Sequence, residues 1–142
     1  MITRNAQARW KGDVPDGSGE VSLGSGLFKG PYGFKSRMGD GSGGTNPEEL
    51  LGAAHAACFS MALALALGQA GHAPDSVETK ARVRLENEQG GYAITLIELA
   101  TAVAVSGIED EEFQKIANDA KTNCPVSKAL AGVEIRLDAT LT

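Results

Sequence analysis

The chain has 142 residues, of which 42% are apolar and 22% are charged, a composition typical of a single folded domain with its own core. The formal net charge is -5 and the 13 basic side chains form no cluster, so the charge pattern does not favour a nucleic-acid-binding protein. The first residues, MITRNAQARW, contain no apolar run of signal-peptide length. We therefore expect a cytoplasmic protein with one domain spanning residues 1–142.

Three strands are predicted in the first third of the chain. Residues alternate between apolar and polar at 6–10, and glycine- and serine-rich turns frame the next two segments, at 20–24 and 32–38. Short turns between short strands favour an antiparallel meander. Arg37 falls at the end of the third predicted strand, immediately before a glycine-rich loop.

A long helix is predicted next, from Pro47 to about residue 67. Asn46 is a suitable N-cap, Pro47 fits the first helical position, and Glu49 completes a capping box with Asn46. The GQAG segment that follows favours a helix stop. The helix is mostly alanine, carries His55 and lacks flanking Lys or Arg, so we do not expect it to cross a membrane.

The same helix is apolar nearly all round and must therefore be covered on every side. A single chain of this length, with one mainly antiparallel sheet, covers one face of the helix well and the other poorly. A second copy of the chain could cover the rest. We therefore predict an obligate homodimer with this helix near its centre.

The second half of the chain alternates strands and helices. A half-buried strand is predicted at 77–86, and a longer strand at 92–106 whose alternation slips near Glu98, as at a β-bulge. A helix with acidic residues in its first turn follows at 108–121, then a short helix in NCPVSKAL and a last strand at 133–141. The predicted fold class is α+β, in the order β-β-β-α-β-β-α-α-β.

Two further patterns do not indicate a cofactor or a metal. The glycines at 39–44 match G-x-G-x-x-G, but the helix N-cap comes after the last of them and no acid lies about 20 residues on to bind a ribose. His55, Cys58 and Cys124 could together hold zinc, but there is no C-x-x-C and few other plausible ligands are nearby. We expect His55 to be a satisfied or partly buried histidine, with no metal and no cofactor bound.

The two cysteines differ in their local setting. Cys58 lies mid-helix among apolar residues, where burial would raise the pKa of its thiol and make it inert unless a positive charge lies close. Cys124 is the predicted N-cap of the short helix, and a helix N-terminus stabilises a thiolate. Local physical chemistry alone therefore favours Cys124 as the thiolate.

A cation and an acid complete the candidate site. Arg37 is the best nearby cation for Cys58, and Glu48 can pair with Arg37 across the glycine-rich loop. Glu48 and Cys58 are ten residues apart, or about 15 Å along one helix, so they cannot touch within it. Two antiparallel copies of the helix in a dimer could bring them together, and the arrangement within one chain or across the dimer stays open.

At this point the sequence resembles a known family. The segments PYGFKSRM, GTNPEELLGAAHAACFSMAL and NCPVSKAL are similar to the OsmC/Ohr family, and specifically to its branch of osmotically inducible proteins. The resemblance extends from AQARWKGD to the last strand. It implies an OsmC-like fold, with antiparallel sheets around a long apolar central helix in an intertwined homodimer. It also implies a thiol-dependent peroxidase that reduces organic hydroperoxides, with hydrogen peroxide as a second candidate substrate.

The resemblance also implies roles for four residues. Cys58 matches the peroxidatic cysteine and Cys124 the resolving cysteine, so that a sulfenic acid at Cys58 would become a Cys58–Cys124 disulfide. Arg37 matches the arginine that holds the thiolate and polarises the peroxide, with Arg9 as the nearest alternative, and Glu48 matches the glutamate that pairs with it. An external dithiol must then reduce the disulfide, and the family resemblance makes a lipoyl-type dithiol the candidate.

Three alternative functions remain to be tested against this interpretation. A binding module with an apolar cleft and inert thiols would lose no thiol to peroxide. A zinc protein using His55, Cys58 and Cys124 would carry stoichiometric metal. A thiol-based redox sensor would form the disulfide without turnover, although no segment for DNA binding supports it.

Overall fold

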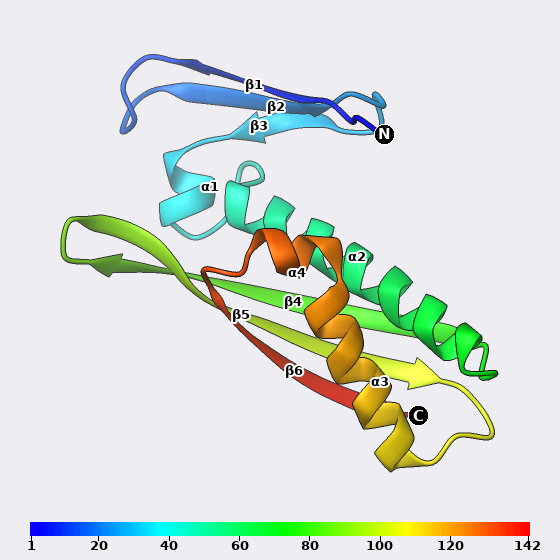
Figure 1. Ribbon diagram of the computed structural model, residues 1–142. Coiled ribbons are helices and arrows are strands. Elements are labelled where there is room, and N and C mark those ends of the chain that lie inside the picture. Colours follow the sequence, from blue (N-terminus) through cyan, green and yellow to red (C-terminus); the bar gives the residue numbers. More distant parts are fainter. The chain divides into compact units, whose positions relative to one another are not determined.

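The computed structural model describes residues 1–142 in two compact units, Met1–Leu50 and Leu51–Thr142. Each unit contains one three-stranded sheet, β1-β2-β3 in the first and β4-β5-β6 in the second (Figure 1). The element order is β1-β2-β3-α1-α2-β4-β5-α3-α4-β6. The α+β class is confirmed, and the order differs from the predicted one by a single additional short helix, α1.

The first unit opens with the predicted antiparallel meander. It consists of β1 (Ala6–Lys11), β2 (Ser18–Leu23) and β3 (Lys29–Tyr32). Trp10 and Tyr32 lie on one face, with their ring centroids 5.5 Å apart. A Cβ at Gly19 would collide with both rings, so the absence of a side chain there lets the two aromatic groups pack across the middle strand.

The expected strand at 32–38 is wrong in its second half, which forms helix α1 (Phe34–Met38). The reason is local hydrogen bonding by Ser36, which outweighs the apolar alternation. Its hydroxyl accepts the N–H of Gly33 (3.0 Å) and donates to the carbonyl of Thr45 (2.7 Å). Arg37 therefore lies in the last turn of a short helix and not at the end of a strand.

Helix α2 (Pro47–Gln69) begins as predicted, with Asn46 as its N-cap. The Asn46 side chain accepts the N–H of Glu49 at 2.7 Å. The Glu49 carboxylate does not complete the reciprocal capping box that was expected, because it accepts a hydrogen bond from the Thr45 hydroxyl instead (2.8 Å). At the other end, the N–H of His72 bonds the carbonyl of Leu67 (2.8 Å), and Gly71 takes a positive φ that favours glycine.

The second unit is built on β4 (Ser76–Glu88), β5 (Gly91–Ala104) and β6 (Glu134–Leu141). β4 and β5 are antiparallel and β5 and β6 are parallel, so the expected mainly antiparallel arrangement is present with β6 as the one parallel strand. The chain reaches β6 from β5 through α3 (Asp110–Asn123) and α4 (Pro125–Ala129). A helical crossover of this kind is the usual way to place two successive strands in parallel.

A β-bulge interrupts the pairing of β4 with β5. Arg84 pairs with Leu96 and Leu85 pairs with Ile94, so Thr95 is the extra residue. The sequence predicted a bulge in this strand near Glu98, three residues further along. The difference arises because apolar residues flank Glu98 closely, and alternation alone locates a bulge only to within a few residues.

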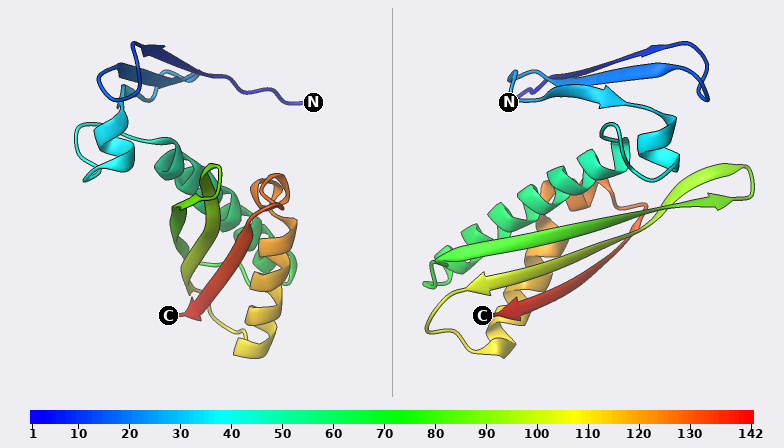
Figure 2. Two further views of the ribbon diagram at one scale, coloured as in Figure 1. Left: turned by 90° about the vertical axis from the view of Figure 1, so that its left-hand side faces the viewer. Right: turned by 180° about the vertical axis from the view of Figure 1, so that it is seen from behind.

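Helices α2, α3 and α4 cover one face of the second sheet (Figure 2). The core between them is formed by side chains from α2, β5 and α3 that are at most 4% exposed: Phe59, Leu63, Leu67, Ile97, Leu99, Val103, Phe113, Ala117 and Ala120. On β4 and β6 the inward-facing positions alternate with exposed ones, as predicted. The core therefore holds α2 and α3 against β5.

The opposite face of α2 is uncovered. Met61 and Leu65 are 76% and 63% exposed, whereas Leu63 between them is fully buried. α2 is also long and apolar enough to match a membrane span by length and composition, with 28% of that window buried. The expectation that one chain covers only one face of this helix is confirmed, and an exposed apolar stripe remains on the other.

Candidate active site

The structure brings the four predicted site residues together as two pairs, one in each unit. The first pair is Arg37, in the last turn of α1, and Glu48, in the first turn of α2. Arg37 Nη2 lies 2.7 Å from Glu48 Oε1, and Nε lies 3.1 Å and 3.2 Å from the two carboxylate oxygens. Glu48 is 7% exposed, so its carboxylate is committed to this contact. The predicted pairing of these two side chains is present, in bidentate form.

The loop around this pair is held by two further hydrogen bonds. The Ser36 hydroxyl donates to the carbonyl of Thr45, and the Asn46 amide donates to the carbonyl of Ser36 (3.1 Å). Both bonds tie α1 to the start of α2 and so fix the guanidinium relative to the carboxylate. Glu48 occupies the Nε edge of Arg37, which leaves Nη1 available to a further anion.

The second pair is Cys58, in the middle of α2, and Cys124, between α3 and α4. Cys124 ends α3 and is the N-cap of α4, with Pro125 at the first helical position, as the sequence predicted. Cys124 is fully buried and Cys58 is half-buried. Both are free thiols, Cys58 packs against the core cluster that contains Cys124, and each influences the ionisation of the other. The fold thus brings together two cysteines that are 66 positions apart in the sequence.

The pKa values of the two thiols shift in opposite directions. Burial, and then the hydrogen bond to Cys124, raise the pKa of Cys58 above its usual range. Burial also opposes ionisation of Cys124, but hydrogen bonds from Cys58, Ser127 and Val126 outweigh it and lower the pKa of Cys124. Within this unit Cys124 is thus the better thiolate. No positive charge is among the influences on Cys58, so its activation requires a cation from elsewhere.

His55 and Ser127 form a buried polar contact next to the cysteines. His55 Nε2 lies 2.7 Å from Ser127 Oγ, and the imidazole is fully buried, so desolvation lowers the pKa of His55 and keeps it neutral. His55 is thus a core histidine whose Nε2 atom has a hydrogen-bond partner. No group of three or more His, Cys, Asp and Glu side chains is arranged as a set of metal ligands. Ser127 was not singled out from the sequence, although it belongs to the NCPVS block.

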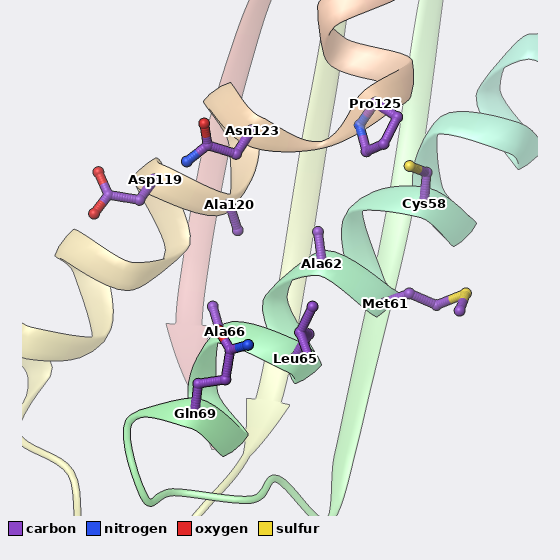
Figure 3. A pocket seen from close by; sticks show the side chains of 10 residues that line it. All are labelled: Cys58, Met61, Ala62, Leu65, Ala66, Gln69, Asp119, Ala120, Asn123 and Pro125. Atoms are coloured by element: carbon purple, nitrogen blue, oxygen red, sulfur yellow. The ribbon is translucent and has the colours of Figure 1, made fainter. Parts of the chain in front are cut away.

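A cavity of about 600 Å³ opens beside Cys58 (Figure 3). Cys58 and Pro125 lie at one end, and Gln69 and Asp119 lie at the other (Figure 3). The walls between them are apolar and come from α2 and α3: Met61, Ala62, Leu65, Ala66 and Ala120. A cavity of this volume and lining accommodates the apolar part of a small organic molecule with its reactive group at the thiol.

Comparison with known proteins shows the family to which this chain belongs. Residues 39–138 match the family described as OsmC-like protein. Peroxiredoxin OsmC of Escherichia coli (strain K12) is 52% identical over 141 residues, which cover 99% of this chain and 97% of that protein. The organic hydroperoxide resistance protein of Xanthomonas axonopodis pv. citri (strain 306) is 37% identical over 105 residues, which cover 73% of this chain and 70% of that protein.

A solved structure shows the same fold. The crystal structure of an organic hydroperoxide resistance protein from Elizabethkingia anophelis superposes with a TM-score of 0.78 at 28% identity. The match covers 100% of this chain and 98% of that one. The resemblance inferred from the sequence segments is thereby confirmed.

Proposed function

Because this chain belongs to the OsmC-like family and is a thiol-dependent peroxidase, we propose that Cys58 is the thiol that reduces its organic hydroperoxide substrates. The observation that carries the proposal is the position of Cys58. This thiol lies at the end of an apolar cavity of about 600 Å³ and contacts the second thiol, Cys124. The cavity supplies a place for the organic part of the substrate, and Cys124 supplies the partner for a disulfide.

The first chemical step is attack by the Cys58 thiolate on one peroxide oxygen. The S–O bond forms while the O–O bond breaks, and the other oxygen leaves as an alkoxide that takes up a proton to become an alcohol. Cys58 is left as a sulfenic acid. The apolar walls favour hydroperoxides with an apolar organic group, because their burial removes apolar surface from water. Hydrogen peroxide, which has no such group, would react without this advantage.

Arg37, held by Glu48, supplies the positive charge that Cys58 needs. Glu48 orients the guanidinium through the bidentate contact and leaves the other edge of Arg37 free to bind an anion. Such a donor stabilises both the thiolate before attack and the alkoxide that develops on the leaving oxygen. The pair acts on a Cys58 either of its own chain or across a homodimer. A positive charge beside Cys58 favours its thiolate, so that Cys58 acts as the nucleophile.

The homodimer is supported by the uncovered face of α2. Met61 and Leu65, which also line the cavity beside Cys58, form an exposed apolar stripe that a second copy of the chain would cover. Sedimentation of the purified protein tests this directly. A dimer is expected for the wild type, and replacement of Leu65 by Glu should shift the equilibrium toward the monomer. A wild-type monomer at micromolar concentration would contradict it.

The catalytic cycle is completed by a reductant from outside the protein. Cys124 converts the sulfenic acid to a disulfide, and an external dithiol of the lipoyl type reduces that disulfide by exchange. No cofactor or metal takes part in these steps. Residues 1–142 act as one peroxidase domain in the cytoplasm, where reducing conditions keep both thiols free between turnovers.

A thiol titration tests the proposal against a binding module with inert thiols. The reduced protein is treated with one equivalent of cumene hydroperoxide, and free thiols are counted before and after. Loss of both thiols in the wild type, with none lost in Cys58→Ser, is expected. Survival of both thiols in the wild type would favour the binding module. A disulfide that forms once but is not turned over with dihydrolipoamide would favour the redox sensor.

A further inference from the structure

The end of the cavity away from Cys58 is polar and has no role in the steps described so far. Gln69 and Asp119 lie at that end, beyond the apolar walls (Figure 3). Asn123, which also lines the cavity, lies one turn of α3 after Asp119. A substrate whose peroxide group is at Cys58 therefore extends its remote end toward these polar side chains.

Asp119 is the one carboxylate among the side chains that line the cavity. Apart from the thiol of Cys58, the other lining side chains are apolar or are the neutral amides of Gln69 and Asn123. The side chain of Asp119 is 61% accessible, and a solvated aspartate carries a negative charge at pH 7. The remote end of the cavity therefore has a negative charge and two groups that can hydrogen-bond to a neutral molecule.

The positive side chains near Asp119 offset its charge only weakly. Lys115, one turn earlier on α3, places Nζ 3.4 Å from Asp119 Oδ2, but its side chain is 80% accessible. Water screens an ion pair of this kind, so the field of the carboxylate still reaches the cavity. Lys121 is directed to the carbonyl of Ile135 (3.5 Å), and Lys128 of α4 is exposed. None of these three lysines lines the cavity.

Helix α2 adds negative potential at the same end of the cavity. Gln69 is the last residue of α2, and the carbonyl end of a helix carries a partial negative charge. The last turn of α2 contains no basic residue that would offset this charge. Both helices that line the cavity therefore disfavour a second anion there, whereas a neutral group can hydrogen-bond to the amides of Gln69 and Asn123.

We propose that Asp119 is a specificity-determining residue, which makes the protein reduce hydroperoxides with a neutral remote end in preference to those with a carboxylate there. The inference rests on the proposed function, since it concerns the substrate that reacts with Cys58. The favoured substrate class has an apolar group next to the peroxide and a hydroxyl, ester or amide group beyond it. Asp119 belongs to the wall supplied by α3, and not to the stripe of Met61 and Leu65 on α2 that a second copy of the chain would cover.

The test uses two derivatives of cumene hydroperoxide, with a carboxamide or a carboxylate para to the carbon that bears the peroxide. The rate constant for oxidation of Cys58 by each is measured by stopped flow and divided by that for dithiothreitol, which removes differences in intrinsic reactivity. The wild type should prefer the carboxamide by about fivefold, because Asp119 repels the carboxylate. In Asp119→Asn the two corrected rates should agree to within about twofold.

Two variants of the same helix serve as comparisons. Lys115→Met removes the partner of Asp119 and should increase the preference for the carboxamide. Glu111→Gln neutralises an exposed acid of α3 that does not line the cavity, and it should leave the preference unchanged.

Ionic strength distinguishes an effect of charge from an effect of shape. The preference of the wild type should shrink between about 0.05 M and about 1 M salt, because added salt screens the charge of Asp119. A preference that persists unchanged at high salt, or that is the same in Asp119→Asn, would overturn the inference. So would equal corrected rates for the two derivatives in the wild type. Oxidation of neither cysteine by any of these peroxides would instead refute the proposed function.

A second measurement does not depend on peroxide. In Cys124→Ser the remaining thiol is Cys58, and a molecule bound in the cavity slows its alkylation by iodoacetamide. The probes are the alcohols that correspond to the two derivatives. The carboxamide alcohol should protect Cys58 at a lower concentration than the carboxylate alcohol, and adding Asp119→Asn should remove the difference. Equal protection by both, or protection by neither, contradicts the inference. If protection differs as expected but peroxide oxidises neither cysteine of the wild type, the selectivity of the cavity stands and the proposed function fails.

Discussion

The guanidinium of Arg37 meets the carboxylate of Glu48 edge to edge, with Nη2 2.7 Å from Oε1 and Nε 3.1 Å from the same oxygen. Arg37 keeps 39% of its side chain accessible, whereas the Glu48 side chain is 9% accessible. The acid is therefore the fixed member of the pair, and the arginine presents its remaining donors outward. This asymmetry suits an arginine that acts on a reacting group and a glutamate that holds it.

Removal of the Arg37 charge should slow the oxidation of Cys58. Arg37→Met leaves the thiol with a pKa raised by burial and without an oxyanion donor, and the rate with cumene hydroperoxide at pH 7 should fall about 100-fold. Arg37→Lys should recover only part of this, because lysine lacks the bidentate edge. Stopped-flow measurement of the first oxidation checks both. Arg82→Met, which removes an exposed arginine of β4, is the control and should react like the wild type.

Substitution of Glu48 should lower the activity of the protein more than its stability. Glu48→Gln keeps an acceptor but loses the charge that orients Arg37, and the first oxidation should slow by about tenfold. Because water can reach Arg37 once the ion pair is weakened, unfolding free energy should change by less than about 1 kcal/mol. Glu49→Gln changes the adjacent, exposed acid and should alter neither quantity greatly. A large loss of stability with full activity in Glu48→Gln would assign the pair a purely structural role.

Partial filling of the cavity should discriminate between substrates. Ala66 lines the cavity away from Cys58, and Ala66→Phe should slow oxidation by cumene hydroperoxide while leaving the reaction with hydrogen peroxide nearly unchanged. Gly68→Ala adds a methyl group to the same helix in open space and is the matched control. The ratio of the two rate constants is the quantity to compare. An equal loss with both peroxides would show that the organic group does not bind there.

Burial of His55 predicts a pH dependence of stability. The pKa of His55 is lowered in the folded protein from an unfolded value of about 6.5, so the unfolded chain binds a proton that the folded one does not. The contribution of His55 to the free energy of unfolding is fully present above about pH 6.5. It is lost as the pH falls toward the pKa of the folded state, by up to about 1.4 kcal/mol per pH unit. Urea unfolding should show this loss in the wild type and a shallower one in His55→Gln.

The other histidine provides the control for that experiment. His72 is partly exposed and lies 3.7 Å from Glu112. His72→Gln should therefore keep the loss of stability assigned to His55. If His55→Gln and the wild type lose stability equally below pH 6.5, the buried imidazole is not the group responsible.

Much of the fold follows from patterns that act over a few residues. The cap at Asn46 and the alternation on β4 and β6 are local, and both were predicted correctly. The helix α1 was missed because it depends on a hydrogen bond from Ser36 to Thr45, nine positions away. The parallel pairing of β5 with β6 was missed because alternation within a strand carries no information about the direction of its neighbour.

The candidate site also combines features that local sequence predicts with features that it does not. The helix-end position of Cys124 and the effect of burial on Cys58 were predicted from local sequence, and the opposite pKa shifts agree with that ranking. The contact between the two thiols came from family resemblance and not from spacing. The hydrogen bond between His55 and Ser127 joins positions 72 apart and produces no periodic pattern in the sequence, so it is found only in the folded structure.

The most direct test of the account is to locate the first oxidised sulfur. Cys124→Ser and Cys58→Ser are each treated with one equivalent of cumene hydroperoxide in the presence of dimedone, and the adduct is located by mass spectrometry. The account predicts rapid labelling of Cys58 in Cys124→Ser and no comparable labelling of Cys124 in Cys58→Ser. Rapid labelling of Cys124 in Cys58→Ser, with Cys58 unlabelled in the other variant, would contradict it and make Cys124 the peroxidatic thiol.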